Sequence, residues 1–151
     1  MSADRSKVIK HRGGDWDGIA VGAYKDPDIA HRGMNRRVLV GEAEDEQAAS
    51  TVTRYFEVDA GGYSTLERHE HSHTVIIVRG NGSVILDDEV HSLAALDCVY
   101  VAPGTLHQFQ ASIDEPLAFL CLVDRERDRG IPASKEDRER LTRKGIPVKP
   151  A

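Results

Sequence analysis

The residues with the clearest capacity for chemistry are histidines clustered near the middle of the chain. His69, His71 and His73 alternate over five residues, and Glu67 lies two positions earlier. If this segment is a strand, all four side chains point to one face, because successive side chains in a strand alternate. Imidazole nitrogen and carboxylate oxygen are normal ligands of divalent metals. Taken alone, the ordinary alternative, a solvated histidine-rich turn, fits the pattern as well as a metal site does.

A second histidine strengthens the metal interpretation. His107 follows the apolar segment 98–101 and a Pro103-Gly104 turn, so we expect it to begin the next strand. A lone histidine in that position is more often structural. Downstream of a histidine cluster, however, it has the placement of a further ligand supplied by a neighbouring strand.

The segments that must position these residues predict an all-β fold. Short runs rich in β-branched and aromatic residues, separated by turns, are typical of a barrel or sandwich. The expected strands are 37–40, 51–58, 74–78, 83–86, 90–93, 98–101, 108–111 and 117–123, with turns at 59–62 and 79–82 and an acidic loop at 42–47.

Both ends of the chain differ from this central part. Residues 1–18 are polar and contain glycine, which predicts a loose N-terminal extension. Residues 134–144 carry helix formers, with Ser134 and Asp137 placed as a capping box and Gly145 where a helix should stop. We expect one domain over 1–151, with the barrel over about 35–125 and a helical tail at 131–151.

Composition and charge exclude several partners. The formal net charge is −5, spread along the chain, which argues against a surface for nucleic acid or anionic membranes. There is no apolar run long enough to span a bilayer, and the N-terminus lacks the apolar core of a signal peptide. We therefore predict a cytoplasmic location. Cys98 and Cys121 do not make a disulfide framework, so both are expected to be thiols and buried small residues.

The histidine segment resembles the first motif of the cupin family, a double-stranded β-helix or jelly-roll barrel. That motif reads Gly-x5-His-x-His-x3-4-Glu-x6-Gly, and Gly61, Glu67, His69, His73 and Gly80 keep its spacing. The residue types depart in two places. A glutamate stands where the first histidine is usual, and a histidine stands where the glutamate is usual.

The second cupin motif usually begins Gly-Asp, contains Pro-x-Gly-x-x-His and ends in Asn. Here Leu96-Asp97 precedes CVYVAPGTLH, which ends at His107, and Ala111 replaces the asparagine. Two motifs at a consistent separation imply the cupin fold, an all-β jelly-roll barrel with a short C-terminal helix in this chain. They say little about the reaction, because this barrel hosts many chemistries.

The resemblance implies a ligand set of Glu67, His69, His73 and His107 around one divalent metal. A carboxylate among the ligands shifts preference toward harder ions, so Mn(II) or Fe(II) is favoured, while Zn(II) and Ni(II) stay open. His71 then falls in the loop between two ligands. It could line the pocket, act as a base, or replace the glutamate as a ligand.

Longer phrases resemble one subgroup of small cupins, namely RYFEVDAGGYSTLERHEHSH, HQF and FLCLVDRERDRG. That subgroup includes enzymes that act on 1-methylthioxylulose 5-phosphate, remove its methylthio group with a thiol acceptor and yield 1-deoxyxylulose 5-phosphate. Such chemistry would need a metal to polarise the ketone, a base such as His71, and a thiol, for which Cys121 is the candidate. The alternative is that Cys121 is inert core.

A phosphorylated substrate also needs cations and a lined pocket. Lys25, Arg36 and Arg54 are the cations in the upstream region, and Tyr63 and Phe109 could line the pocket, although solvation or core packing is the commoner role for each. Gln108 and Gln110 should point away from the metal face.

Three classes of function therefore compete. The first is a metal-dependent enzyme that acts on a small polar metabolite, phosphorylated or not, by thioether cleavage, isomerisation or elimination. The second is an Fe(II)-dependent dioxygenase, which the fold also supports. The third is a non-catalytic small-molecule-binding barrel. By analogy with cupins, we also expect a homodimer that pairs through strands near its N-terminus.

Overall fold

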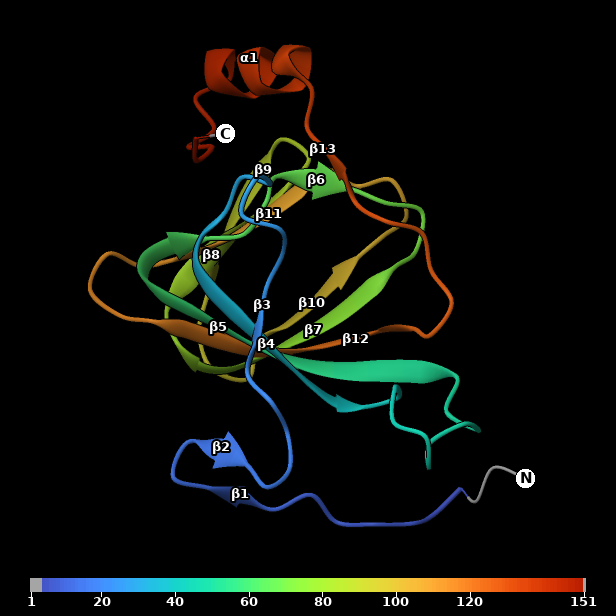
Figure 1. Cartoon of the computed structure of the whole chain (residues 1–151). Coiled ribbons are helices and arrows are strands. Elements are labelled where there is room, and N and C mark those ends of the chain that lie inside the picture. Colours follow the sequence, from blue (N-terminus) through green and yellow to red (C-terminus); the bar gives the residue numbers. More distant parts are fainter. Residues whose placement is uncertain (1–3, 151) are drawn as a thin grey trace.

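The computed structural model describes residues 4–150, so Met1–Ala3 of the predicted N-terminal extension and Ala151 of the predicted tail lie outside the described residues. Strands dominate the described part (Figure 1). The elements are β1 (His11–Arg12), β2 (Asp15–Trp16), β3 (Gly22–Ala23), β4 (Arg32–Val40), β5 (Thr51–Tyr63), β6 (Glu67–Arg68), β7 (His73–Gly80), β8 (Gly82–Leu86), β9 (Glu89–Leu93), β10 (Cys98–Val101), β11 (His107–Ala111), β12 (Leu117–Asp124), β13 (Ile131–Pro132) and α1 (Lys135–Arg143).

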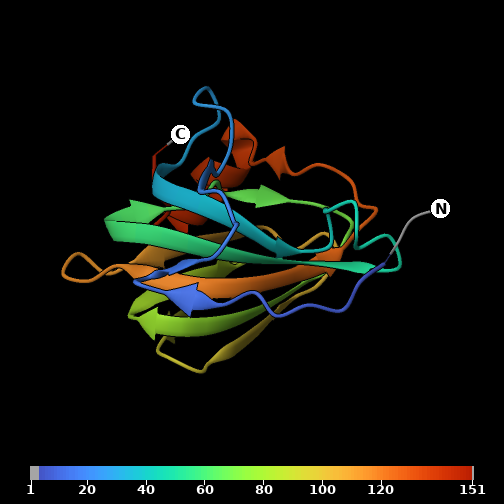
Figure 2. The ribbon, with the colours of Figure 1, turned by 60° about the horizontal axis from the view of Figure 1, so that its bottom comes forward.

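One curled antiparallel sheet holds most of the strands. Its order is β10-β7-β12-β5-β11-β6-β13, while β4 pairs with β5, β8 with β11, and β9 with β8. Figure 2 shows these strands stacked around a common interior, with α1 to one side. This is the predicted all-β jelly-roll arrangement. Because strands distant in sequence are adjacent in the sheet, it brings β6, β7, β11 and β12 around one cavity.

The turn predicted at 59–62 is wrong, because β5 continues through it to Tyr63. The partner strand is the reason: β4 begins at Arg32 rather than Arg37, and Arg32 pairs with Tyr63. Gly62 allows close approach of the two backbones, since a Cβ there would collide with the carbonyl of Arg32. Glycine here serves strand packing rather than chain reversal.

The turn predicted at 79–82 does not join a hairpin, because β7 pairs with β10 and β12 whereas β8 pairs with β9 and β11. The chain instead bends there from one part of the sheet into another, at Gly80, whose φ of +86° favours glycine. The predicted start of the helix is confirmed. Helix α1 begins after Ser134, which accepts a hydrogen bond from the backbone N–H of Asp137, while the Asp137 side chain accepts one from the backbone N–H of Ser134. This is the capping box expected from the sequence.

Two apolar clusters hold the barrel and its tail. The main core fills the interior with valine, isoleucine and phenylalanine from both sides of the sheet. A smaller cluster of Leu66, Leu106 and Leu141 joins α1 to the barrel end. Gln108 and Gln110 are buried on that side and bind the carbonyls of Ser64 and Pro147, so they point away from the cavity as predicted.

The N-terminal region is more ordered than the sequence suggested. Strands β1 and β2 form a short hairpin, which in Figure 1 lies at the opposite end of the molecule from α1. Trp16 of this hairpin packs edge-on against Tyr55 of β5, with ring centroids 4.7 Å apart, and Asp15 accepts a 2.8 Å hydrogen bond from Arg37. The prediction for Cys98 is also wrong, since it is exposed, although both cysteines are free thiols as expected. No helix among the described residues is long and apolar enough to cross a membrane.

Candidate metal centre and its cavity

The histidine segment is not one strand. Glu67 ends up in β6 and His73 begins β7, with a bend between them that carries His69 and His71. Simple alternation along a strand therefore does not explain why the imidazoles meet. The bend folds them over one another, and β11 brings His107 directly opposite Glu67 in the sheet.

Three of the predicted ligands converge. The ligand atoms of His69, His73 and His107 all lie within 4.8 Å of one another. The Nδ1 atoms of His69 and His107 lie 2.7 and 2.8 Å from the carbonyls of His71 and Thr105. Because a carbonyl only accepts, each Nδ1 carries the proton and each Nε2 keeps its lone pair.

The free lone pairs point to a metal. The Nε2 atom of His69 is buried and has no hydrogen-bond partner among the described residues. Such an atom is costly to bury unless something satisfies it. Burial lowers the pKa of His107 to about 4, and it also lowers the pKa of His69 and His73, to which neighbouring imidazoles add. At neutral pH the triad thus holds the uncharged imidazoles that bind divalent metals.

Glu67 lies beside the triad but has another partner. Its Oε2 atom forms an ion pair with the Nζ atom of Lys25 inside the cavity. The carboxylate also packs against Gly130, where any Cβ would collide with it. The structure thus brings together three of the four predicted ligands, and metal ligation by Glu67 stays a prediction.

His71 is held in the cavity by an aspartate that the sequence did not single out. Asp128 Oδ1 lies 2.8 Å from His71 Nδ1, and the carboxylate accepts hydrogen bonds from the backbone N–H groups of Glu70 and His71. These bonds hold the pKa of Asp128 well below its usual range. His71 stacks on His69 at 3.9 Å between centroids, and its Nε2 atom lies 3.1 Å from Nε2 of His73.

The Cys121 thiol faces this cluster. Its Sγ atom lies 3.5 Å from His73 Nδ1 and accepts a 3.2 Å contact from Nη2 of Arg54. Burial raises the pKa of the Cys121 thiol, while the charge and hydrogen bond of Arg54 act in the opposite direction. Cys98 offers no such environment, because it is exposed and is not part of the cavity lining.

A cavity of about 530 Å³ contains all these groups. Of the predicted pocket residues, Lys25, Arg36, Arg54 and Phe109 line it, whereas Tyr63 does not. Sequence reasoning missed Arg127 and Asp128. Both lie in the phrase FLCLVDRERDRG that carried the family resemblance, but no spacing rule placed them at the metal face.

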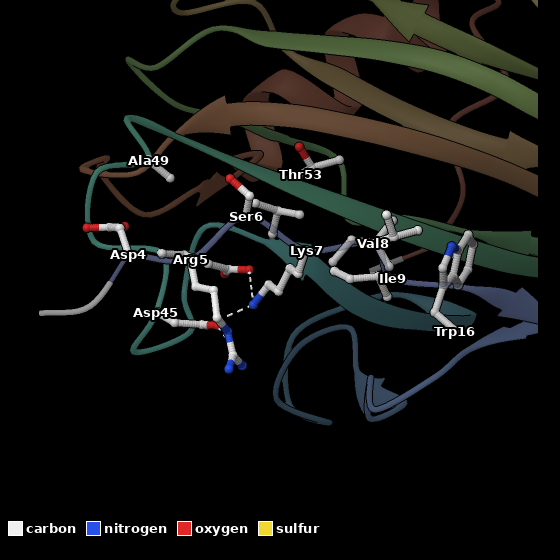
Figure 3. Close-up of a pocket in the computed structure, with 13 residues that line it drawn as sticks. Asp4, Arg5, Ser6, Lys7, Val8, Ile9, Trp16, Asp45, Ala49 and Thr53 are labelled. Atoms are coloured by element: carbon white, nitrogen blue, oxygen red, sulfur yellow. Dashed lines mark hydrogen bonds and ion pairs between the residues drawn. The ribbon is translucent and has the colours of Figure 1, made fainter.

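A larger cavity of about 680 Å³ lies under the N-terminal segment (Figure 3). Figure 3 shows Lys7 reaching toward acidic side chains there, and its Nζ atom lies 2.8 Å from both Asp45 and Glu46. Its charged groups therefore neutralise one another, and none of its described lining residues belongs to the metal-capable cluster. The chemistry belongs to the smaller cavity.

Comparison with known proteins agrees with this geometry. A family model described as a cupin domain matches residues 54–123. Over 115 residues the chain is 41% identical to 1-methylthio-D-xylulose 5-phosphate methylsulfurylase of Rhodospirillum rubrum. The aligned region covers 76% of this chain and 71% of that protein. The chain belongs to the cupin family.

Solved cupin structures extend the match over nearly the whole chain. A cupin-2 domain protein of Rhodospirillum rubrum aligns with a TM-score of 0.78 and 36% identity, covering 92% of this chain and 89% of the other. A cupin 2 conserved barrel protein of Rhodopseudomonas palustris gives 0.80 and 38%, covering 91% and 93%. A cupin 2 domain-containing protein of Halorhodospira halophila gives 0.72 and 40%, covering 96% and 97%.

Proposed function

We propose that this cupin is a metal-dependent enzyme that cleaves the methylthio group from a phosphorylated keto sugar such as 1-methylthio-D-xylulose 5-phosphate. The observation that carries the proposal is the position of the Cys121 thiol, 3.5 Å from His73 of the triad and inside the same cavity. Similarity to the Rhodospirillum methylsulfurylase supplies the substrate. A thiol beside a carbonyl-binding site is what transfer of a methylthio group requires.

The chain's own residues divide the work as follows. The thiolate of Cys121 attacks the methylthio sulfur, an S–S bond forms, and the electron pair of the broken C–S bond remains on the sugar carbon. His71, oriented by Asp128, delivers a proton to that carbon. Overall the thiol proton ends on the sugar, and the protein carries a methyl disulfide at Cys121. A small thiol from solution then attacks the methylthio sulfur of this disulfide, so that the S–S bond to Cys121 breaks, a small mixed methyl disulfide leaves, and the Cys121 thiol is regenerated with the proton of the incoming thiol.

His69, His73 and His107 would hold the metal. When bound there, a divalent ion supplies a Lewis acid next to the substrate ketone. The expected preference for Mn(II) or Fe(II) rests on a carboxylate ligand, and Lys25 pairs with that carboxylate here. Three imidazoles also suit Fe(II), Zn(II) and Ni(II), so the metal content of purified protein decides the ion.

The decisive experiment compares Cys121→Ser with Cys98→Ser. The protein is incubated with 1-methylthio-D-xylulose 5-phosphate without added thiol, and intact-mass spectrometry then measures the protein. We expect one methylthio adduct per chain in wild type and in Cys98→Ser, together with one equivalent of 1-deoxyxylulose 5-phosphate. Cys121→Ser should give neither product. Equal turnover by Cys121→Ser and wild type would refute a thiol role for this residue.

A second candidate is an Fe(II)-dependent dioxygenase, which the three-imidazole set favours because it leaves positions open around the ion. Oxygen consumption that requires added Fe(II) and a small organic substrate would support it. Methylthio transfer under anaerobic conditions would exclude oxygen as a reactant. A protein that binds the sugar phosphate but turns over neither reaction would be a non-catalytic binding barrel.

A further inference from the structure

Three arginines line one side of the cavity, next to Cys121. Arg36 comes from β4, Arg54 from β5, and Arg127 from the segment after β12. Arg54 pairs in the sheet with Cys121, and Arg36 pairs with Phe56, two positions further along the same strand as Arg54. The cluster is therefore built by neighbouring strands of the sheet and by the chain that leaves β12.

The charges of this cluster are not balanced by the described residues. Within residues 4–150, Arg54 has no carboxylate partner; its side chain is 8% exposed, and its Nε atom is buried without a hydrogen bond. Arg36 likewise has no ion pair in that range. Arg127 has one ion pair there, 3.7 Å to Glu42, whose side chain is 52% exposed, and its Nη1 atom donates hydrogen bonds to the carbonyls of Asp124 and Arg125 at 3.1 and 3.2 Å. Burial lowers the pKa of Arg127, and repulsion from the charges of Arg54 and Arg36 lowers it further.

Two other charged groups of the cavity have partners, whereas Asp26 and Arg129, which also line it, form no ion pair within residues 4–150, with the arginines or otherwise. Lys25 forms its ion pair with Glu67, and Asp128 binds His71. Neither is free to neutralise the arginines or to take a charged ligand. A buried charge is retained at a cost unless a partner satisfies it. Guanidinium groups match phosphate and carboxylate oxygens with paired hydrogen bonds, so the missing partner has the chemistry of an oxyanion.

We propose that Arg36, Arg54 and Arg127 form the oxyanion-binding site of this cavity, with Lys25 excluded from that role. The anionic group has two possible sources, the phosphate of the sugar substrate or a carboxylate of the acceptor thiol. The choice between these sources rests on the proposed function, whereas the anion site itself does not.

The site is tested first without turnover, by isothermal titration of the full chain with inorganic phosphate. Arg36→Gln and Arg127→Gln are the test variants, because both side chains are partly exposed and tolerate replacement. We expect each to weaken phosphate binding at least about tenfold, which corresponds to about 1.4 kcal/mol. Arg79→Gln is the matched control, since Arg79 is an exposed arginine of β7 that pairs with Glu57 outside the cavity. It should bind phosphate as wild type does.

Absence of saturable phosphate binding in wild type, or equal binding by all variants, would overturn the proposal. Kinetics with 1-methylthio-D-xylulose 5-phosphate and a carboxylated thiol then distinguish the sources. A rise in the sugar phosphate KM alone assigns the phosphate, and a rise in the thiol KM alone assigns the carboxylate. Phosphate binding that depends on the arginines in a protein without methylthio transfer would leave the anion site standing and reject the proposed reaction.

Discussion

Replacing Arg54 by methionine should leave the ligand-free protein as stable as wild type or slightly more stable. Arg54 is 8% exposed, and its Nε atom is buried without a partner, which costs about 1–3 kcal/mol. The variant would lose two contacts of the Arg54 guanidinium, the one with Cys121 and the stacking over Phe56, whose ring centroid lies 5.0 Å from the Arg54 Cζ atom. Each contact is worth about 1 kcal/mol. The variant would also remove the repulsion felt by Arg127.

These first three terms sum to between about −1 and about +1 kcal/mol. Relief of the repulsion with Arg127 moves the expected change to between zero and about 1 kcal/mol in favour of the variant, or up to about 2–4 °C in Tm for a chain of this size. A paired buried charge behaves differently, since removal of one partner costs about 3–5 kcal/mol. The assay is thermal unfolding by circular dichroism, on wild type and Arg54→Met freed of metal and phosphate. The same variant should lose phosphate binding. A loss of more than about 1 kcal/mol would show that Arg54 is a structural residue and refute the unbalanced-charge reasoning.

Three further predictions concern the metal site, the helical tail and the bend at Gly80. His69→Ala should abolish metal binding and the effect of a chelator on Tm, whereas His91→Ala, at an exposed histidine, should change neither. Equal metal content of the two variants in elemental analysis would contradict the role of the triad as the metal site. The hydrogen bond from Arg68 lowers the pKa of Asp137 to about 2. The ionised Asp137 side chain therefore adds about 1–2 kcal/mol to the free energy of unfolding above pH 4, and this contribution is lost as the pH falls toward 2. The difference in urea-unfolding free energy between wild type and Asp137→Asn should shrink across that window, and a constant difference would exclude this linkage. Gly80→Ala should lower the free energy of unfolding by at least about 2 kcal/mol, because Gly80 has a positive φ and a Cβ there would also collide with the Pro116 carbonyl. Gly104 has a positive φ but open space around it, so Gly104→Ala should lower that free energy by only about 1 kcal/mol in the same thermal assay.

Much of the fold could be predicted from the sequence because its signals are local. Alternating β-branched runs gave the strands, and the reciprocal bonds of Ser134 and Asp137 gave the start of the helix. The prediction failed at 59–62, where Gly62, one of the glycines that suggested a turn, instead allows β4 and β5 to approach closely. A glycine indicates that the backbone needs space or an unusual φ, and only the partner strand shows which of the two applies.

The candidate site could likewise be predicted only in part. Motif spacing was sufficient to select His69, His73 and His107, because a cupin barrel brings its two motifs together whenever strand lengths are kept. It was not sufficient for Glu67, since the approach of Lys25 from 42 residues upstream depends on how the N-terminal segment crosses the cavity mouth. Asp128 and Arg127 lie in a loop, whose path depends on packing rather than on periodicity.

By itself, then, the sequence determined the barrel and the three histidines of the triad, and it offered Cys121 as the candidate thiol. These follow from side-chain alternation and from motif spacing, which act over a few residues. Only the tertiary structure decided the charge balance of the cavity. Lys25 pairs with Glu67 and His71 with Asp128, and these pairs join segments that are distant in sequence. Within residues 4–150, Arg36 and Arg54 then have no carboxylate partner, and Arg127 has only its 3.7 Å contact with Glu42.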